Sequence, residues 1–306
     1  MIKGKPKKNK IGLKSQLLFY CTVLAVPTLQ FLIFYVAVNI NSILLAFKGY
    51  DIKGNSSFIG WDNFAEVFRQ FSETQFIKDA LVNSLVLGFF TIVVGISFAL
   101  LFSYYIYKKK FFSGVFKVFL YVPQIVSSLV LVIIFKYMAE DAYIRVMQDL
   151  FGIKTLGLLS DPNTQFTTVM IYSIFVGFGP QVLMYSGAMS GISDSIVEAG
   201  QLDGITPLRE FFQITIPMIW PTVTSFIVVN LANVFVNQMQ LFSFYGAGAE
   251  YRLYTLGYYL YSMIKKTSTS ITDYPYLSAF GLVLTLFTIP ATLLVRKLLE
   301  RMYKVE

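Results

Sequence analysis

The sequence has no histidine, a single cysteine and few charges, since only 14% of its 306 residues are Asp, Glu, Lys or Arg. Without histidine, Ser-His-Asp and Cys-His nucleophile systems, His-ligated zinc and haem on a proximal histidine are excluded. Cys21 alone cannot form an intrachain disulfide. Soluble domains carry about 25% charged residues, so this chain has too little polar surface to cover itself in water.

The few charges lie between long stretches that contain none. Asp, Glu, Lys and Arg are absent from residues 15–47, 80–107, 118–135, 162–193, 211–249 and 274–295. Each stretch is comparable to or longer than the roughly 20 apolar residues that cross a bilayer as a helix. The sequence therefore predicts an all-α integral membrane protein with six transmembrane helices. The expected spans are about 17–46, 81–107, 115–138, 166–190, 217–240 and 276–297.

The distribution of Lys and Arg predicts the orientation. The first 16 residues contain six lysines and no acid, and positive-inside bias keeps such a segment in the cytoplasm. Alternate loops then place both termini, 1–16 and 300–306, inside. The net charge of +8 is interpreted as this topological signal and not as a nucleic-acid footprint. Outside, aromatic residues at helical spacing from Trp61 to Phe71 predict an amphipathic helix at the membrane interface.

One cytoplasmic loop does not follow the charge rule. Residues 194–210 contain four acids and only one base. Ser195 and Glu198 have the spacing of a capping box, which would start a short helix ending at Gly204. Thr206 as N-cap and Pro207 at the first position would start a second helix. Because a helix of two turns is marginal alone, we expect a docking partner, although an ordinary interfacial loop would show the same capping signals.

This loop resembles the EAA loop of permease subunits in binding-protein-dependent ABC importers. The resemblance rests on the spacing of Glu198, Ala199, Gly204, Ile214 and Pro217, and on the pair Asp203-Gly204, which resembles the Asp-Gly-Ala of carbohydrate permeases. Gly200 and Ile216 depart from the pattern, where Ala and Leu are usual. The remaining similarity is to the maltose F-type half, in Phe58–Phe64, Asn83–Leu85, Pro123, Leu159–Pro162 and Tyr254–Leu256; Gly246–Gly248 departs from it.

The resemblance implies a type I ABC importer permease with its domain at 17–299 and its coupling loop at 191–216. It would lie in the bacterial cytoplasmic (inner) membrane. Its implied partners are a second six-span permease, two ABC ATPase subunits, an extracytoplasmic substrate-binding protein and a carbohydrate. The coupling residues would be Glu198, Ala199, Gly200, Asp203, Gly204, Ile214 and Pro217. No G-x-x-x-x-G-K-[ST] occurs, so the chain is expected to be no enzyme and to hold no cofactor, with ATP and Mg bound by the partner ATPase.

Side chains suited to sugar hydroxyls lie in the apolar spans. Asn230, Asn233 and Asn237 would share one face of a helical span five, with Gln238 beside them. Amides can bind substrate or form interhelical hydrogen bonds, and resemblance to the maltose F-type half favours substrate at Asn233 and Asn237. Further candidates, for which packing or interfacial roles are the alternative, are Tyr121, Gln124, Tyr172, Gln181 and Tyr185.

Two other classes of membrane protein also have long apolar stretches. A secondary transporter or channel for a small neutral solute is the alternative, but ion-coupled carriers usually keep ionisable residues inside the membrane, and the six stretches have none. A membrane enzyme would lack an acid–base pair in the spans. The predicted cavity is neutral, which suits a carbohydrate better than a charged amino acid or a phosphate.

Overall fold

The computed structural model describes residues 11–51, 53–267 and 271–302, with the backbone alone at residues 11–14, 266 and 267. Apart from one short hairpin and the connecting loops, the described residues are helical. The chain divides into two units, residues up to 67 with 271–282, and residues 68–270 with 283 to the end.

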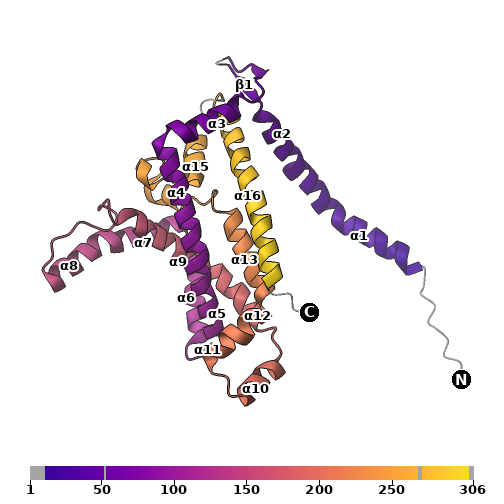
Figure 1. Cartoon of the computed structure of the whole chain (residues 1–306), viewed down its shortest axis with the longest axis vertical. Coiled ribbons are helices and arrows are strands. Elements are labelled where there is room, and N and C mark those ends of the chain that lie inside the picture. The colour runs from indigo at the N-terminus through magenta and orange to yellow at the C-terminus, as the bar shows by residue number, and fades with distance from the viewer. Residues whose placement is uncertain (1–10, 52, 268–270, 303–306) are drawn as a thin grey trace. The chain divides into compact units, whose positions relative to one another are not determined.

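The first unit contains a long helix with an unusually apolar surface. Helix α1 (Ile11–Gln30), the π-helical segment η1 (Phe31–Ala37) and α2 (Val38–Leu45) run on without a break (Figure 1). The segment Ser15–Leu45 has a mean hydropathy of 2.0, and none of its most apolar window is buried. In water such a surface would be an aggregation liability, so this helix is suited to lipid.

A hairpin and an aromatic cluster follow this helix. Strand β1 (Lys48–Tyr50) pairs antiparallel with β2 (Ser56–Phe58), and α3 (Asp62–Glu73) comes next. The Asn63 amide donates to the carbonyls of Ala46 and Lys48 at 2.8 and 2.9 Å. The rings of Phe47, Trp61 and Phe64 contact one another with centroids 5.0–5.1 Å apart. The helix expected from the aromatic spacing is thus present as α3.

The second unit contains the remaining helices. In chain order they are α4 (Gln75–Phe90), η2 (Thr91–Gly95), α5 (Ile96–Tyr107), α6 (Ser113–Ile125), α7 (Ser128–Tyr137), η3 (Met138–Ala142), α8 (Tyr143–Phe151), α9 (Gln165–Met189), α10 (Asp194–Leu202), α11 (Pro207–Glu210), η4 (Phe211–Thr215), α12 (Ile216–Met218), α13 (Trp220–Ala232), α14 (Leu241–Tyr245), η5 (Tyr251–Leu253), α15 (Leu256–Thr267) and α16 (Tyr274–Met302), which begins in the first unit. The core of this unit joins α5, α9 and α13 through buried side chains that include Leu100, Val182 and Val223. Ser103 Oγ donates to the Val182 carbonyl at 2.9 Å, which ties α5 to α9.

Four described helical segments are long and apolar enough to cross a membrane. They are Ser15–Leu45, Gln75–Tyr107, Gln165–Met189 and Tyr274–Met302. Two more candidates are broken, Ser113–Ile125 with Ser128–Phe151 bent by 107°, and Pro207–Met218 with Trp220–Ala232 bent by 74°. The described chain therefore has four to six candidate spans. The expected spans at 115–138 and 217–240 fall on the two bent pairs, so neither is a continuous helix.

The break in the first bent pair follows from two extended residues. Val126 and Ser127 have ψ values of 142° and 132°, outside the helical range. Ser127 is the N-cap of α7, and its carbonyl accepts from Leu131 N at 3.1 Å. A new helix therefore begins at Ser128, inside a stretch whose apolar composition suggested a continuous one, and the Ser127 side chain makes no capping hydrogen bond.

The helix of the expected fifth span ends early, at Ala232, with Asn233 as its C-cap. The Nδ2 atoms of Asn230 and Asn233 donate to the carbonyls four residues earlier, both at 2.9 Å. The helix stops at Ala232, and Met239 and Gln240 have left-handed φ values of 52° and 56°. The predicted face shared by Asn230, Asn233 and Asn237 is therefore wrong.

Candidate functional site

A polar cavity of about 260 Å³ lies inside the second unit, among η2, α6, α9, α13 and the chain after α13. Amides, hydroxyls and backbone line it, and none of its lining residues is charged. The lining residues are Thr91, Gly95, Gln124, Ser173, Ile174, Val176, Gly177, Phe178, Gln181, Asn230, Asn237 and Gln240. The lining is more polar than apolar, which suits a ligand rich in hydrogen-bonding groups.

Hydrogen bonds hold the amides of this cavity in place. Gln124 Nε2 donates to the Val176 carbonyl at 2.7 Å, and Gln181 Nε2 lies 3.5 Å from Asn230 Oδ1. Asn237 Oδ1 accepts from Met239 N at 2.9 Å. The Gln181 Oε1 atom is buried and bonds to no described residue. Since a buried unpartnered acceptor is costly, a movement of the surrounding helices that brings a donor to this oxygen, from the protein or from a ligand hydroxyl, would stabilise the site.

The structure brings together four of the predicted substrate residues, Gln124, Gln181, Asn230 and Asn237. Three polar residues of the lining were missed as candidates, and each stands in a stretch without charges: Thr91, Ser173 and Gln240. A polar side chain in a charge-free stretch is a general signal of a cavity or of a contact between helices. The side of the helix on which it lies decides whether it faces a cavity.

Other predicted substrate residues lie outside this cavity. Asn233 is exposed at the end of α13, and Gln238 and Tyr121 are absent from the lining. Tyr172 is 5% exposed and packs against the rings of Phe135 and Phe244, with centroids 4.7 and 5.0 Å away. Because Tyr172 is buried against these two rings, its role is packing, which was the alternative to substrate binding.

Tyr185 is also a packing residue. It is fully buried, and its ring lies 5.0 Å from that of Phe226 in a T-shaped contact. Its hydroxyl bonds to no described residue and its side chain belongs to the core of α5, α9 and α13.

Hydrogen bonds join two short segments of this unit that are about 170 residues apart, Asn83-Ser84 and residues 252–256. Asn83 Nδ2 donates to the carbonyls of Arg252 and Tyr254 at 2.8 and 2.9 Å, and Leu256 N donates to Ser84 Oγ at 2.8 Å. Thr255 Oγ1 donates to the Asn237 carbonyl at 2.8 Å. This clasp holds α4, α15 and the chain beside the cavity together.

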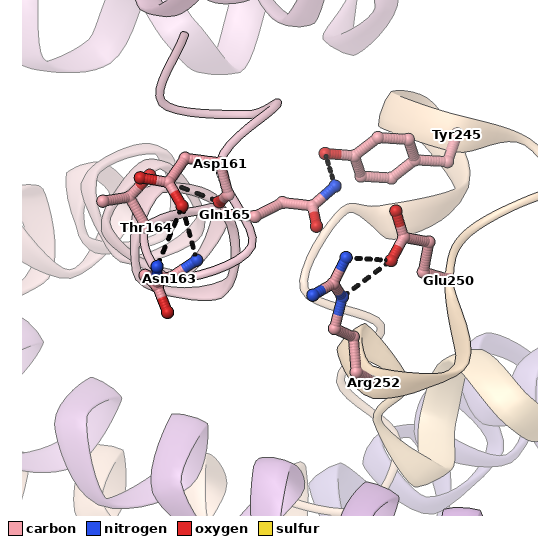
Figure 2. Close-up of polar contacts among 7 residues, drawn as sticks. All are labelled: Asp161, Asn163, Thr164, Gln165, Tyr245, Glu250 and Arg252. Atoms are coloured by element: carbon pink, nitrogen blue, oxygen red, sulfur yellow. Dashed lines mark hydrogen bonds and ion pairs between the residues drawn. The ribbon is translucent and has the colours of Figure 1, made fainter. Parts of the chain in front are cut away.

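The polar surface near the start of α9 is shown in Figure 2. Asp161 Oδ1 accepts from Asn163 N at 2.9 Å, which forms a turn just before α9. Gln165 Nε2 donates to the Tyr245 hydroxyl at 3.2 Å, and Arg252 pairs with Glu250 nearby. Burial raises the pKa of the Tyr245 phenol, and the carboxylates of Glu140 and Glu250 act in the same direction. Tyr245 is therefore neutral at physiological pH.

The loop between α9 and α13 forms two short helices at a bend, as predicted. Gly204 has a φ of 74°, Gly204 N donates to the Gln201 carbonyl at 3.0 Å, and Ile205 N donates to the Gly200 carbonyl at 3.1 Å. These two bonds are a Schellman cap. Thr206 precedes Pro207, the first residue of α11.

The start of α10 differs from the prediction. Its N-cap is Ser193, with Asp194 as the first helical residue, and no side chain caps the helix. Ser193 Oγ and Ser195 Oγ share a hydrogen bond at 2.7 Å. The expected capping box of Ser195 and Glu198 is wrong because Ser193 is already extended, with a ψ of 131°. Glu198 and Ala199 are exposed on α10.

Close packing explains why glycine and not alanine stands at position 200. A Cβ atom at this position would lie 2.8 Å from Ile214 Cδ1 and 3.5 Å from Ile205 Cδ1. Gly200 is buried on α10, while Leu202 is 90% exposed and Asp203 is exposed. The first short helix therefore packs one side against Ile214 and leaves its other side uncovered in this chain.

The fold matches chains of solved ABC transporters over almost its whole length. One chain of a bacterial ABC transporter involved in the import of the acidic polysaccharide alginate aligns with a TM-score of 0.77 and 20% identity, covering 96% of this chain and 98% of that one. A chain of bacterial alginate ABC transporter in complex with alginate pentasaccharide-bound periplasmic protein aligns with a TM-score of 0.73 and 19% identity, covering 96% of both chains. The chain therefore shares the fold of these ABC transporter chains.

Sequence comparison gives the family. Residues 91–304 match the family of the binding-protein-dependent transport system inner membrane component, to which this chain belongs. The maltose/maltodextrin transport system permease protein MalF of Klebsiella aerogenes is 30% identical over 186 residues, and that of Escherichia coli strain K12 is 29% identical over 185. Each match covers 58% of this chain and 35% of the relative, so the matched segment spans about a third of these relatives. The chain is a multi-pass inner membrane protein.

Proposed function

We propose that this chain is one permease half of an ATP-driven ABC importer for a neutral oligosaccharide. The observation that carries the proposal is the cavity of amides and hydroxyls, in which Gln181 Oε1 is buried without a described partner. Amides both donate to and accept from sugar hydroxyls. The lining has no base to neutralise a carboxylate, which favours a neutral sugar over an acidic one.

The partners and the orientation belong to the same proposal. A second six-span permease would complete the pathway, and an external binding protein would deliver the sugar. Two ATPase subunits would bind ATP and Mg and dock on α10, with Glu198, Ala199, Gly200, Asp203, Gly204, Ile214 and Pro217 forming the docking loop. The exposed side of α10, with Leu202 uncovered, supports this role. Both termini would lie in the cytoplasm, where the excess of Lys and Arg is expected.

Uptake by the complete transporter in proteoliposomes tests the substrate and the energy source. We expect ATP-dependent uptake of neutral oligosaccharides and none of uronate oligosaccharides. Gln181→Leu removes the buried acceptor and should reduce uptake by about tenfold or more, since a lost hydrogen bond in a buried site costs about 1–3 kcal/mol. Asn233→Leu is the matched control, because this amide is exposed at the end of α13, and should change uptake little.

Three outcomes would contradict the proposal. Uptake driven by an ion gradient in the absence of an ATPase would support a secondary transporter or channel for a small neutral solute. Uptake limited to uronate oligosaccharides would refute the neutral substrate. Equal losses in Gln181→Leu and Asn233→Leu would show that the cavity does not select the sugar.

A further inference from the structure

A buried ion pair joins the end of α5 to the end of α11. Lys108, the C-cap of α5, pairs through Nζ with Glu210 Oε1. Their side chains are only 20% and 6% exposed. In contrast, Arg296 and Glu300 form a surface pair on α16 with side chains 60% and 54% exposed. The first pair is thus shielded from water, whereas the second is an ordinary surface pair of small energetic effect.

Aromatic residues of the last turns of α5 surround this ion pair. The Tyr104 hydroxyl donates to the Pro207 carbonyl at 3.0 Å, and its ring lies 4.9 Å from that of Phe211. Lys108 Nζ lies 5.7 Å from the ring centroid of Tyr104 and 5.5 Å from that of Tyr107. An ammonium within about 6 Å of an aromatic ring is attracted to it. The end of α5 therefore holds α11 and the start of η4 through an ion pair, a hydrogen bond and ring contacts.

The pair resists separation because the charge of Glu210 would otherwise remain buried alone. Breaking a buried pair by removing one partner is strongly destabilising. The link from α10 to α11 is short, Asp203 to Thr206, and its backbone is fixed by the Schellman cap at Gly204. A displacement of α10 that reaches α11 must then move the end of α5 as well, or break the pair.

Helix α5 leads back to the cavity. It packs along α9 and follows η2 without a break. Thr91 and Gly95 of η2 and Ser173 of α9 all line the cavity. We propose that the Lys108–Glu210 pair is the joint that transmits movement of α10 to α5 and so to the cavity wall. This inference rests on the proposed function, in which α10 docks on the ATPase.

The experiment measures how the accessibility of the cavity wall changes when ATP binds. In the complete transporter, purified with its ATPase, Cys21→Ala removes the chain's own cysteine and Ser173→Cys places a single one in the cavity. The rate at which a maleimide labels this cysteine is measured with and without ATP and vanadate, together with ATP hydrolysis. Lys108→Met and Glu210→Gln each remove one charge, and Lys108→Glu with Glu210→Lys exchanges the two.

We expect ATP to change the labelling rate in the otherwise unchanged chain. In each neutralised variant, the ATP-dependent change in labelling rate should be smaller by a factor of about five or more, which is the lower end of typical coupling between sites. The ATPase should stay bound and hydrolyse ATP. The charge exchange should restore the response. Arg296→Met, which removes the surface pair, is the matched control and should respond like the parent chain.

The possible failures are distinguishable. If the parent chain binds no ATPase or shows no ATP response, the proposed function is wrong. If the parent responds and Lys108→Met responds equally, the joint is refuted and the proposed function stands. If the neutralised variants lose the ATPase, restoration of both binding and response by the charge exchange supports the joint. If the exchange then restores neither, the pair only maintains the fold and the inference fails.

Discussion

Replacing Gly179 by alanine should separate α6 from α9 and lower the stability of the second unit. A Cβ atom at this position would lie 2.4 Å from the Leu120 carbonyl oxygen. Ordinary C···O contacts are about 3.3–3.6 Å, so α6 must move outward by about 1 Å. The neighbouring bond from Gln124 Nε2 to the Val176 carbonyl, now 2.7 Å, would lengthen beyond the range of a hydrogen bond.

The size of the effect follows from two opposing contributions. Overpacking a tight contact costs about 1–3 kcal/mol, and losing the exposed hydrogen bond of Gln124 adds at most about 1 kcal/mol. Alanine in place of glycine inside a helix stabilises the helix by about 1 kcal/mol, which offsets part of this cost. The net destabilisation is about 1–3 kcal/mol. For a domain of this size each kcal/mol corresponds to a fall in Tm of about 2–4 °C.

Thermal unfolding of the purified chain in detergent measures this difference, and the same helix supplies the control. Nothing lies within 4 Å of a Cβ atom at Gly187, so Gly187→Ala gains the helical preference without a clash and should leave Tm unchanged or raise it. Gly179→Ala should also weaken sugar uptake, because Gln124 lines the cavity. Equal Tm values for Gly179→Ala and Gly187→Ala would refute the close approach of α6 and α9.

Two further predictions concern the clasp and the loop. Ser84→Ala leaves the buried Leu256 N–H without its acceptor and should lower the free energy of unfolding by about 1–3 kcal/mol, measured by thermal unfolding. Ser97→Ala is the control and should have little effect, because the exposed Ser97 hydroxyl bonds only the Val93 carbonyl one turn earlier. Equal values for the two variants would contradict the clasp. Gly204→Ala places a side chain at a φ of 74° and should cost about 1–2 kcal/mol, seen as faster amide exchange at Ile205, and unchanged exchange there would argue against the Schellman cap.

Local chemistry made much of the loop and the helices predictable. Gly204 adopts the left-handed conformation that its missing side chain allows, and Pro207 begins a helix because its fixed φ is suited to that position. The same local reasoning misplaced the start of α10, since Ser193 and Ser195 both have the side chain of an N-cap and only the backbone distinguishes them.

The cavity was predictable in composition but not in geometry. Gln124, Gln181, Asn230 and Asn237 were identified as polar residues in apolar stretches and do line it. The shared helical face was wrong, because the helix ends at Ala232 and Met239 and Gln240 take left-handed φ values. Composition gives the hydrophobicity of a stretch, whereas the backbone conformation of a few residues decides where a helix stops.

The sequence by itself determined the class of protein, because the absence of charge over long stretches is a property of composition that no packing can change. It also determined the bend at Gly204, which depends on a single residue. Only the tertiary structure decided that Gly200 faces Ile214, that Asn83 bonds the carbonyl of Tyr254 and that Lys108 pairs with Glu210. These contacts join residues that are distant in the chain, and their energy depends on burial and on distances that exist only after the helices have packed.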